Sequence, residues 1–430
     1  MSAASESLNL ESAASAAASP RSSVALQAIV FLVAFALLFL RRPDAILNAQ
    51  FYSEDGSYWY ADAYHFGWRC LLLPLGGYLN SLSRLIGMFS LLFPFAMAPL
   101  FMNLCALVAG ILPIHIFLSS RFKSIPFNTR LLGSLLYVAL PNSFELHATT
   151  TNIQWHLALA ACLVLLGRQE SGRAWQIFDF LILTLLVLDG PLGIVLIPVV
   201  LYLRWFRKDS RYNLALFALI PGAFLQLLVL FIAAPRRPAP NGATVARLID
   251  ILGGQIFLSS LFGLRTLIQL FGHVRSLPII DFFAMLVGLA ILFYTLWRGP
   301  LELRLFILFA TAVLVLGLIH PLATTDGDHV QWEQLQIPGC GNRYYFFPML
   351  AFLASLIWMS VDRSIPAKAP RYVALALLIF LPVGIFRDWR YRPFEDLHFK
   401  EIAADFQRAP RGTQFVIPIN PGVSMKLTKQ

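Results

Sequence analysis

Long apolar stretches recur along almost the whole chain and are separated by short polar segments. A run of about 20 apolar residues is long enough to cross a bilayer as a helix. The pattern therefore predicts about eleven membrane-spanning helices, the shorter ones extended into flanking residues or broken by proline near one surface. The predicted spans are Val24–Leu40, Phe95–Ser119, Leu131–Glu145, Ile153–Gly167, Trp175–Leu188, Leu192–Leu203, Tyr212–Ala233, Ile279–Trp297, Leu305–His320, Tyr345–Val361 and Tyr372–Phe386.

The first apolar stretch follows an Ala- and Ser-rich segment and ends at Arg41-Arg42-Pro43, with no small-x-small cleavage site before the arginines. We interpret it as a permanent anchor and not as a removed signal peptide. The expected organisation is a disordered cytoplasmic tail at 1–23, a transmembrane bundle at 24–386 with outer loops at 41–84, 235–278 and 321–343, and a short external tail at 387–430 that packs on the outer loops.

Five short loops between the spans together hold 14 Lys or Arg in 41 residues. Cytoplasmic loops are enriched in positive charge, so we expect these loops and the amino terminus inside the cell and the carboxyl terminus outside. Two further apolar segments, Leu85–Phe93 and Ala243–Gly263, are predicted to be amphipathic helices on the outer face and not crossings. The five loops are Arg121–Arg130, Arg168–Arg173, Arg204–Arg211, Arg298–Arg304 and Asp362–Arg371.

Composition supports this interpretation. Apolar residues make up 58% of the 430 residues and charged residues only 13%, with a mean hydropathy of +0.69. Soluble domains are about 45–50% apolar and about 25% charged, so a soluble fold is excluded. The net charge of +10 would suggest nucleic acid in a soluble protein, but here the basic residues lie between spans. The sequence thus predicts an all-α polytopic protein of the cell inner (plasma) membrane, whose partner is the lipid bilayer and not nucleic acid.

Several common cofactor motifs are absent from the sequence: it has no P-loop, GxGxxG, HExxH, GxSxG or paired CxxC. A nucleotide-driven pump and a thiolate zinc site therefore have no support. Of the four cysteines, Cys105 and Cys162 fall inside predicted spans, whereas Cys70 and Cys340 fall on the outer side. For the outer pair, two free thiols are favoured over a disulfide.

Two adjacent carboxylates, Glu54 and Asp55, follow the first span closely, and aromatic residues such as Tyr58 come next. Adjacent carboxylates repel each other, so at least one needs a cation, a metal, a donor or a proton. One interpretation is a general base or metal-anchoring pair facing a sugar acceptor. The other, slightly favoured on spacing alone, is a helix start, because Ser53, Glu54 and Asp55 suit a first turn whose dipole favours negative charge.

A second polar group lies at the outer ends of the third and fourth predicted spans. Many hydrogen-bonding side chains there indicate a water-filled cavity, but an ordinary polar hairpin in the headgroup layer explains them equally well. The histidines could be catalytic, although an interfacial histidine is more often only a hydrogen-bond partner. The group comprises Asn142, Glu145, His147, Thr149–Thr151, Asn152, Gln154, Trp155 and His156.

A third group combines Asp326 and Asp328 with His329, a pattern that could hold a divalent cation such as Mg²⁺ or Mn²⁺. A solvated loop is the commoner reason for this pattern. Arg343 and Arg84 each lie directly before apolar sequence, where an arginine either extends to the interface or binds a phosphate. Taken singly, each arginine favours the interface role.

Five short motifs of the chain, taken together, resemble those of bacterial multipass proteins of the GT-C glycosyltransferase type. The resemblance covers most of Val24–Phe386. The motifs are Glu54-Asp55-Gly56, Gly77-Tyr78 to Arg84, Pro141-Asn142 to Trp155, Asp189-Gly190-Pro191 and Gly341-Asn342-Arg343-Tyr344-Tyr345. GT-C enzymes take a sugar from a polyprenyl-phosphate donor and use an acidic residue of the first outer loop as base or metal ligand. Unlike well-studied members, this chain has no large carboxyl-terminal soluble domain.

The resemblance implies that Glu54 and Asp55 carry the chemistry and that Arg84 or Arg343 contacts the donor phosphate. The implied activity is sugar transfer to a cell-envelope glycan or lipid acceptor on the outer face. Such a donor is already activated, in agreement with the missing nucleotide motifs. The residues expected to contact substrate are Tyr58, Tyr78, Asn80, Glu145, His147, Asn152, Trp155 and Tyr344.

Two other functions compete with this one: a transporter or flippase of lipid-linked saccharides, and a polymerase or ligase with a polyprenyl-diphosphate donor. A transporter is expected to show repeated halves and polar or broken helices at mid-membrane. Here the polar residues gather at the outer mouths, and no convincing internal repeat is present. The sequence therefore favours the enzyme.

Overall fold

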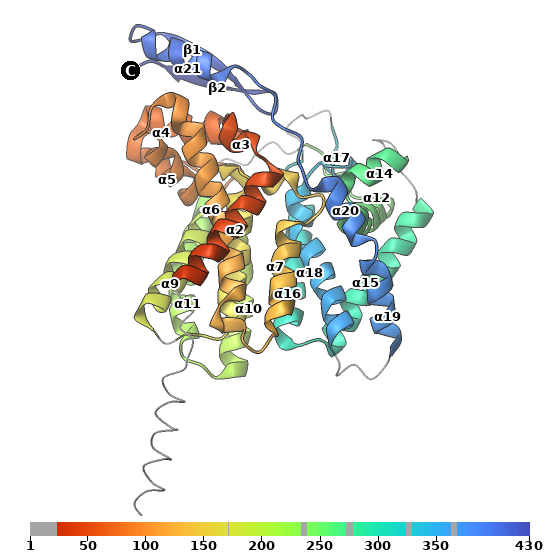
Figure 1. Cartoon of the computed structure of the whole chain (residues 1–430). Helices are drawn as coiled ribbons and strands as arrows, with labels where there is room; N and C mark the ends of the chain where they lie inside the picture. Colours follow the sequence, from red (N-terminus) through yellow and green to blue (C-terminus); the bar gives the residue numbers. More distant parts are fainter. Residues whose placement is uncertain (1–23, 171, 234–238, 272–277, 324–328, 363–367) are drawn as a thin grey trace, which may run out of the picture.

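The computed structural model describes residues 24–170, 172–233, 239–271, 278–323, 329–362 and 368–430. Helices pack side by side in one bundle, and a small carboxyl-terminal unit lies at one end (Figure 1). We call this the hairpin end, because it carries the two strands of the described chain together with α4 (Ala61–Phe66) and α5 (Ser81–Ser90); the opposite end is the loop end. The all-α polytopic class predicted from the sequence is confirmed, with a β-hairpin added.

A helix occupies each predicted span. The bounds are α2 (Val24–Arg41), α6 (Ala98–Leu118), α7 (Phe127–Val138), α8 (Ile153–Leu166), α9 (Arg173–Leu188), α10 (Leu192–Arg207), α11 (Tyr212–Ile232), α15 (Pro278–Arg298), α16 (Leu301–Ile319), α18 (Asn342–Val361), and α19 (Lys368–Leu378) with α20 (Leu381–Asp388). Among the described residues, seven helices are long and apolar enough to cross a membrane on length and composition. The number of crossings therefore stays a prediction.

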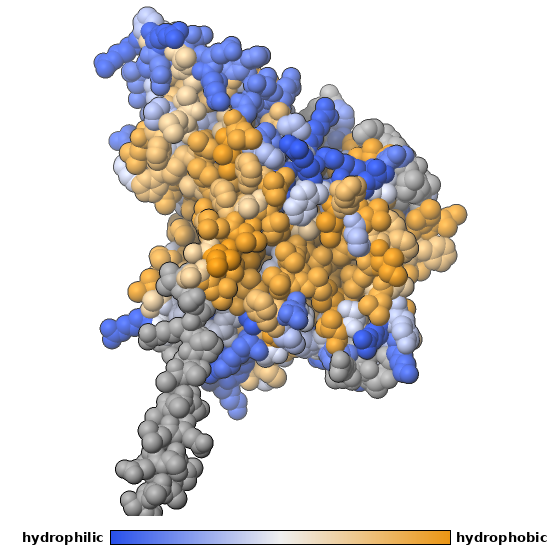
Figure 2. Space-filling model, viewed as in Figure 1, coloured by the Kyte–Doolittle hydropathy of each residue, from blue (hydrophilic) through white to orange (hydrophobic). Residues whose placement is uncertain are grey.

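Apolar side chains cover the outside of the bundle between its two polar ends, and Figure 2 shows this hydrophobic belt. Phe231, Phe293 and Phe386 expose 84%, 73% and 83% of their surface, values that suit contact with lipid and not with water. In contrast, α18 is buried along almost its whole length. A helix that is apolar on all sides and buried is the centre of the bundle.

The segment after α7 departs from the prediction. The span Leu131–Glu145 was expected to be helical throughout, but α7 ends at Val138 and the chain continues as a buried, largely irregular segment. Pro141 explains the early end, because the residue before a proline disfavours the helical conformation. Asn142 follows with φ 51°, which also terminates a helix. The correction matters, since this segment builds the candidate site described below.

The predicted outer-face helices are both present at the hairpin end. The first is α5 (Ser81–Ser90), and the second runs through α12 (Val245–Ile249), η7 (Asp250–Leu258) and α13 (Ser259–Phe262). Although the second is long and apolar enough to cross, Arg247 near its start pairs with Glu333 of α17 (Gln331–Gln336), and Leu264 just after its end donates to Asp388 at the end of α20. Both partners lie at the hairpin end (Figure 1), so the helix does not traverse the bundle.

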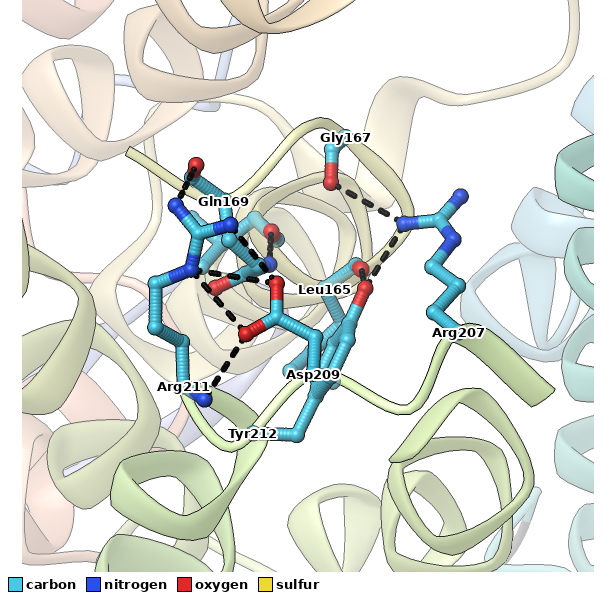
Figure 3. Close-up of polar contacts among 8 residues, drawn as sticks. Leu165, Gly167, Gln169, Arg207, Asp209, Arg211 and Tyr212 are labelled. Atoms are coloured by element: carbon cyan, nitrogen blue, oxygen red, sulfur yellow. Dashed lines mark hydrogen bonds and ion pairs between the residues drawn. The ribbon is translucent and has the colours of Figure 1, made fainter. Parts of the chain in front are cut away.

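The described residues of the five arginine-rich loops lie at the loop end. There Arg207 donates to the carbonyls of Leu166 and Gly167 at the end of α8 and forms an ion pair with Glu302 (Figure 3 draws the carbonyl of Gly167). Figure 3 also shows Arg211 paired with Asp209. Cationic side chains near helix carboxyl ends satisfy free carbonyls and complement the helix dipole.

The last residues form α21 (Phe399–Arg408) and an antiparallel hairpin of β1 (Gln414–Ile419) and β2 (Val423–Thr428). The alternating run Thr413–Ile419, bounded by prolines, predicts one strand here, whereas β2 was not predicted. The apolar face of this unit packs on η1 (Asp55–Tyr60) and the residues before it: Phe399 contacts Phe51 edge-on with ring centroids 5.2 Å apart. The tail thus packs on η1 and the residues before it.

The topology can be tested by cysteine labelling. In a background without the four native cysteines, a cysteine at the exposed position Ser210 lies at the loop end and one at the exposed position Thr428 lies at the hairpin end. We expect a reagent that cannot enter the cytoplasm to label position 428 only, because the arginine-rich loops should face inward. Labelling of position 210 without position 428 would reverse the orientation.

Candidate functional site

The irregular segment between α7 and α8, residues 139–152, is buried at the hairpin end. Backbone groups buried away from water must find partners, and an irregular segment cannot supply all of them itself. Side chains from other parts of the chain provide them, chiefly Arg41, Arg42, Asp55 and Asp388. The candidate site is therefore assembled around this segment.

Arg41, the last residue of α2, is fully buried and satisfies two helix ends at once. It donates to the carbonyls of Val138 and Leu140 after α7, the latter at 3.0 Å, and to those of Asp388 and Trp389 after α20, each at 3.1 Å. Its guanidinium also lies 4.3 Å from the centre of the Tyr391 ring. The planar five-donor group suits this fork-like contact, which a lysine could not reproduce.

Arg42 is buried beside it and donates to the carbonyl of His147 at 3.0 Å. Its guanidinium lies over the rings of Phe394, at 4.4 Å, and Tyr391, at 5.3 Å. Burial and the charge of Arg41 lower the pKa of His147, so its ring is neutral. His147 therefore serves this arginine pair through two atoms: its carbonyl accepts from Arg42, and its Nε2 atom lies 3.4 Å from Arg41 Nη1.

The two adjacent carboxylates have different surroundings. Asp55 is buried and accepts three hydrogen bonds: from the Thr150 amide (3.1 Å), the Thr151 amide (2.6 Å) and the Thr151 hydroxyl (2.7 Å). These amides stand at the turn that leads into α8, so Asp55 acts as an N-terminal cap supplied from another segment. Burial raises the pKa of Asp55 to about 7, against the lowering effect of the threonine donors.

Glu54, in contrast, has a buried carboxylate oxygen that is not satisfied: among the described residues, no donor lies within hydrogen-bond distance of Oε2. Its backbone follows Ser53, which has φ 47°, and the Ser53 amide donates to the carbonyl of Asn420 at 2.6 Å. A non-glycine residue with positive φ is strained and persists only where the surroundings hold it. The hairpin unit thus holds the backbone beside Glu54.

Arg343 and Glu145 form a half-buried ion pair between α18 and the irregular segment. Arg343 donates to Glu145 from its guanidinium and from its backbone amide, the latter at 3.3 Å, and it also donates to the carbonyl of Leu322. The guanidinium lies 5.0 Å from the centre of the Tyr344 ring. Two residues that the sequence placed in separate polar groups are therefore in direct contact.

Tyr52 links these groups, since its hydroxyl lies within the electrostatic reach of all four charges. Burial raises its pKa, Glu145 and Glu54 raise it further, and Arg42 and Arg343 lower it. Its ring stacks on Phe394 with centroids 5.0 Å apart. We call the set Arg42, Tyr52, Glu54, Glu145 and Arg343 the polar centre. It contains two cations, two carboxylates and a phenol at the hairpin end of the bundle.

Arg84 lies elsewhere. It is buried in α5, donates to Asp62 at 2.7 Å and lies 5.0 Å from the centre of the Trp59 ring. Its charge is therefore matched by a protein carboxylate, and a donor phosphate would have to compete with Asp62.

The remaining residues predicted to contact substrate differ in their surroundings. Asn80 and Asn152 are buried and donate to backbone carbonyls, those of Leu75 and Tyr78 for Asn80 and that of Glu145 for Asn152. Tyr58 is 42% exposed, whereas Tyr78 lies near Gly190.

Trp155 and Tyr344 face each other edge-on with ring centroids 6.0 Å apart. The Trp155 indole nitrogen is buried without a hydrogen-bond partner in the described part of the chain, as are both amide atoms of Asn342 and the Oε1 atom of Gln154. Buried polar atoms without partners are uncommon in folded proteins, and each calls for a water or a ligand. These three side chains come from the first turns of α8 and α18.

The proposed metal residues Asp326 and Asp328 lie outside the described residues. Within the described ranges, no group of three His, Cys, Asp or Glu side chains is placed to share a metal ion. The four cysteines of the described chain are free, in agreement with the favoured interpretation of Cys70 and Cys340.

Sequence reasoning missed Tyr52 and Arg42 as members of the site. Both stand close to Glu54 in the chain, so proximity alone was a signal, but an arginine after a span is ordinarily a topology signal. Asn342 was noticed only as part of a motif. Its burial without partners cannot be seen from the sequence.

Comparison with known proteins gives no family assignment: no family model and no curated protein matches the chain. Two solved structures of ArnT from Cupriavidus metallidurans are similar. The apo structure is 12% identical with a TM-score of 0.42, covering 85% of this chain and 74% of that one. The structure bound to undecaprenyl phosphate is 13% identical with a TM-score of 0.41, covering 85% and 75%.

The different surroundings of Glu54 and Asp55 predict opposite effects on stability. Asp55→Asn places an amide NH₂ where a donor now points, and should lower the free energy of unfolding by about 1–3 kcal/mol. Glu54→Gln neutralises a carboxylate that has an unsatisfied oxygen, and should leave stability unchanged or raise it. Thermal unfolding in detergent measures both.

The control for these variants is Asp405→Asn, at a 70% exposed side chain of α21. It should change the unfolding midpoint little. Equal losses of stability in Glu54→Gln and Asp55→Asn would show that the two carboxylates do not differ in role.

Proposed function

We propose that this protein is a membrane glycosyltransferase that moves a sugar from a polyprenyl-phosphate donor to a glycan or lipid acceptor at the hairpin end, with Glu54 as general base. The observation that carries the proposal is the buried, unpartnered Oε2 atom of Glu54 beside the Glu145–Arg343 ion pair. The polar centre therefore contains a carboxylate oxygen that can accept a proton, on Glu54, and a cation that can bind an anion, Arg343.

The reaction follows from these groups. Glu54 would take the proton of an acceptor hydroxyl, and the oxygen would attack the anomeric carbon of the sugar. The bond from that carbon to the phosphate oxygen would break, and the polyprenyl phosphate would leave with the bonding electrons. A single displacement of this kind inverts the anomeric centre. The donor is already activated, so no nucleotide is required.

Arg343 is the better supported of the two arginines for the leaving phosphate. Like Arg84, Arg343 is paired with one carboxylate, but its side chain is 23% exposed against 1% for Arg84, and it stands beside Tyr344 and the unpartnered amide of Asn342. A phosphate arriving there would replace Glu145 as the partner of Arg343 and form a bidentate contact. Arg84, in contrast, is held in α5 by Asp62 and Trp59.

Asp55 takes a different part in this proposal. It joins η1 to the start of α8, and thereby fixes the backbone that carries Glu54 against the segment that carries Glu145. The aromatic pair Trp155 and Tyr344 and the amide of Asn342 would contact the sugar, because their polar atoms are unpartnered or their rings suit stacking. A divalent cation, Mg²⁺ or Mn²⁺, would be an addition tested by chelation.

Replacing Glu54 by glutamine tests the chemistry. Loss of a general base typically lowers the rate about 10²–10⁴-fold, so Glu54→Gln should lose transfer by this factor while unfolding at the parent temperature or above. The assay follows sugar transfer by purified protein from a panel of polyprenyl-phosphate donors, with and without chelator. The matched control is Glu401→Gln on α21, a 79% exposed side chain, which should keep the parent rate.

Two results would decide against the proposal. The first is transfer at the parent rate by Glu54→Gln. The second is a parent protein that transfers no sugar from any donor but moves lipid-linked saccharide between the leaflets of a vesicle, which would make it a transporter.

The role of Arg343 is tested by donor binding. Arg343→Ala should weaken binding of a polyprenyl-phosphate sugar by about 1.5–3 kcal/mol, roughly 10- to 150-fold, because a charge-assisted contact is lost. Arg343→Lys should restore binding only in part, since lysine lacks the guanidinium fork. Titration of the donor into purified protein gives both constants.

Arg84→Ala serves as the comparison, because it leaves the half-buried Asp62 without its cation. It should reduce stability more than donor affinity. If Arg84→Ala lowered affinity and Arg343→Ala did not, the phosphate site would have to be moved to α5.

A further inference from the structure

Three arginines line an open pocket at the hairpin end, at some distance along the chain from the polar centre. Arg265 comes from the start of α14 (Leu264–Phe271), whereas Arg390 and Arg392 come from the segment that joins α20 to α21. The pocket has a volume of about 500 Å³, and Tyr391 and Pro393 complete its lining. All three arginines are exposed.

The charge of this pocket is not balanced by the protein. Among the described residues, none of the three guanidiniums is paired with a carboxylate. The nearest acid along the chain, Asp388, is buried and already accepts from the amides of Asn142, Leu264 and Arg265. Its carboxylate is occupied by these backbone amides, so the three guanidiniums are left available to an anion from outside.

The shape of the pocket is held by hydrogen bonds. Arg265 donates from its guanidinium to the carbonyl of Arg390, which ties α14 to the joining segment. The backbone amide of Tyr391 donates to the carbonyl of Arg41 at 2.8 Å, and the Tyr391 hydroxyl bonds with Ser143 at 2.9 Å. Arg390 and Arg392 make no side-chain hydrogen bond within the described chain. They are therefore free to contact a ligand on a fixed backbone.

The position of the pocket points to a lipid. Directly before it, α20 and the residue that precedes this helix expose apolar side chains: Phe380, Val383 and Phe386 have 43%, 47% and 83% of their surface uncovered. In Figure 2 hydrophilic residues gather just beyond the hydrophobic belt, over α20 and the segment that follows. A pocket at this level meets the headgroup layer, where lipid phosphates lie.

We propose that Arg265, Arg390 and Arg392 form a binding site for the phosphate of an anionic lipid headgroup. Guanidinium groups bind phosphate oxygens in pairs of parallel hydrogen bonds, and three of them around one pocket exceed what a single arginine extending to the interface provides. The site is separate from the polar centre: Tyr391 lies between them, with the pocket on one side and Arg41 and Arg42 on the other. Binding there requires no sugar transfer.

The test uses the double variant Arg390→Gln and Arg392→Gln, because these two side chains hold nothing else in the structure. The matched control is Lys400→Gln with Arg411→Gln, which removes the same charge from exposed positions of the carboxyl-terminal unit. Purified full-length protein in detergent is titrated with dioctanoyl phosphatidylglycerol, dioctanoyl phosphatidylcholine and inorganic phosphate. Thermal unfolding confirms that both variants are folded.

We expect phosphatidylglycerol to bind the parent protein and the control with similar affinity, and the double variant at least about tenfold more weakly. Phosphatidylcholine should bind poorly to all three. Equal phosphatidylglycerol affinity in parent and double variant would overturn the site. Inorganic phosphate binding as tightly as the lipid, with the same dependence on Arg390 and Arg392, would overturn the lipid source and leave a site for free phosphate.

Discussion

The contact on which the hairpin end depends is the buried guanidinium of Arg41. It donates hydrogen bonds to the free carbonyls at the ends of α7 and α20, helices that lie about 250 residues apart in the sequence. Water is excluded there, so without this arginine the carbonyls would lose their partners, and each would cost several kcal/mol at membrane depth. The arginine that ends α2 therefore contributes directly to the burial of the irregular segment 139–152, together with Arg42, Asp55 and Asp388.

Carboxylates do the corresponding work at helix starts. Asp55 caps the start of α8, Asp189 that of α5 and Asp388 that of α14, each from a different part of the chain. Positive helix starts favour carboxylates and negative helix ends favour arginines, so the charges lie where the helix dipoles are complemented. The buried charges of Arg41, Asp55, Asp189 and Asp388 are thereby explained as structural. Against this background Glu54 differs, because its buried oxygen satisfies no helix.

The sequence predicts the helices well because one physical quantity, the length of an apolar run, decides whether a segment crosses lipid. It predicts less about the site. Glu54, Glu145 and Arg343 were all selected, but their meeting depends on the packing of α18 against the segment after α7, which no local pattern encodes. Asp55 and Arg84 have the same residue types as the candidates, and only their partners, Thr151 and Asp62, set them apart. Pro141 was a readable signal for the end of α7.

Two segments that are far apart in the sequence, the one after α2 and the one after α20, meet at the polar centre. Arg42, Tyr52 and Glu54 come from the first segment after α2, and the segment after α20 returns to cover them with Tyr391 and Phe394. The strained Ser53 is held through the carbonyl of Asn420, just after β1. A short tail, too small to form a core of its own, is thus stabilised by packing on η1, and in return fixes the backbone beside Glu54. The geometry of the proposed base therefore depends on contacts made by the last residues of the chain, and the polar centre forms only when the bundle and the tail are both in place.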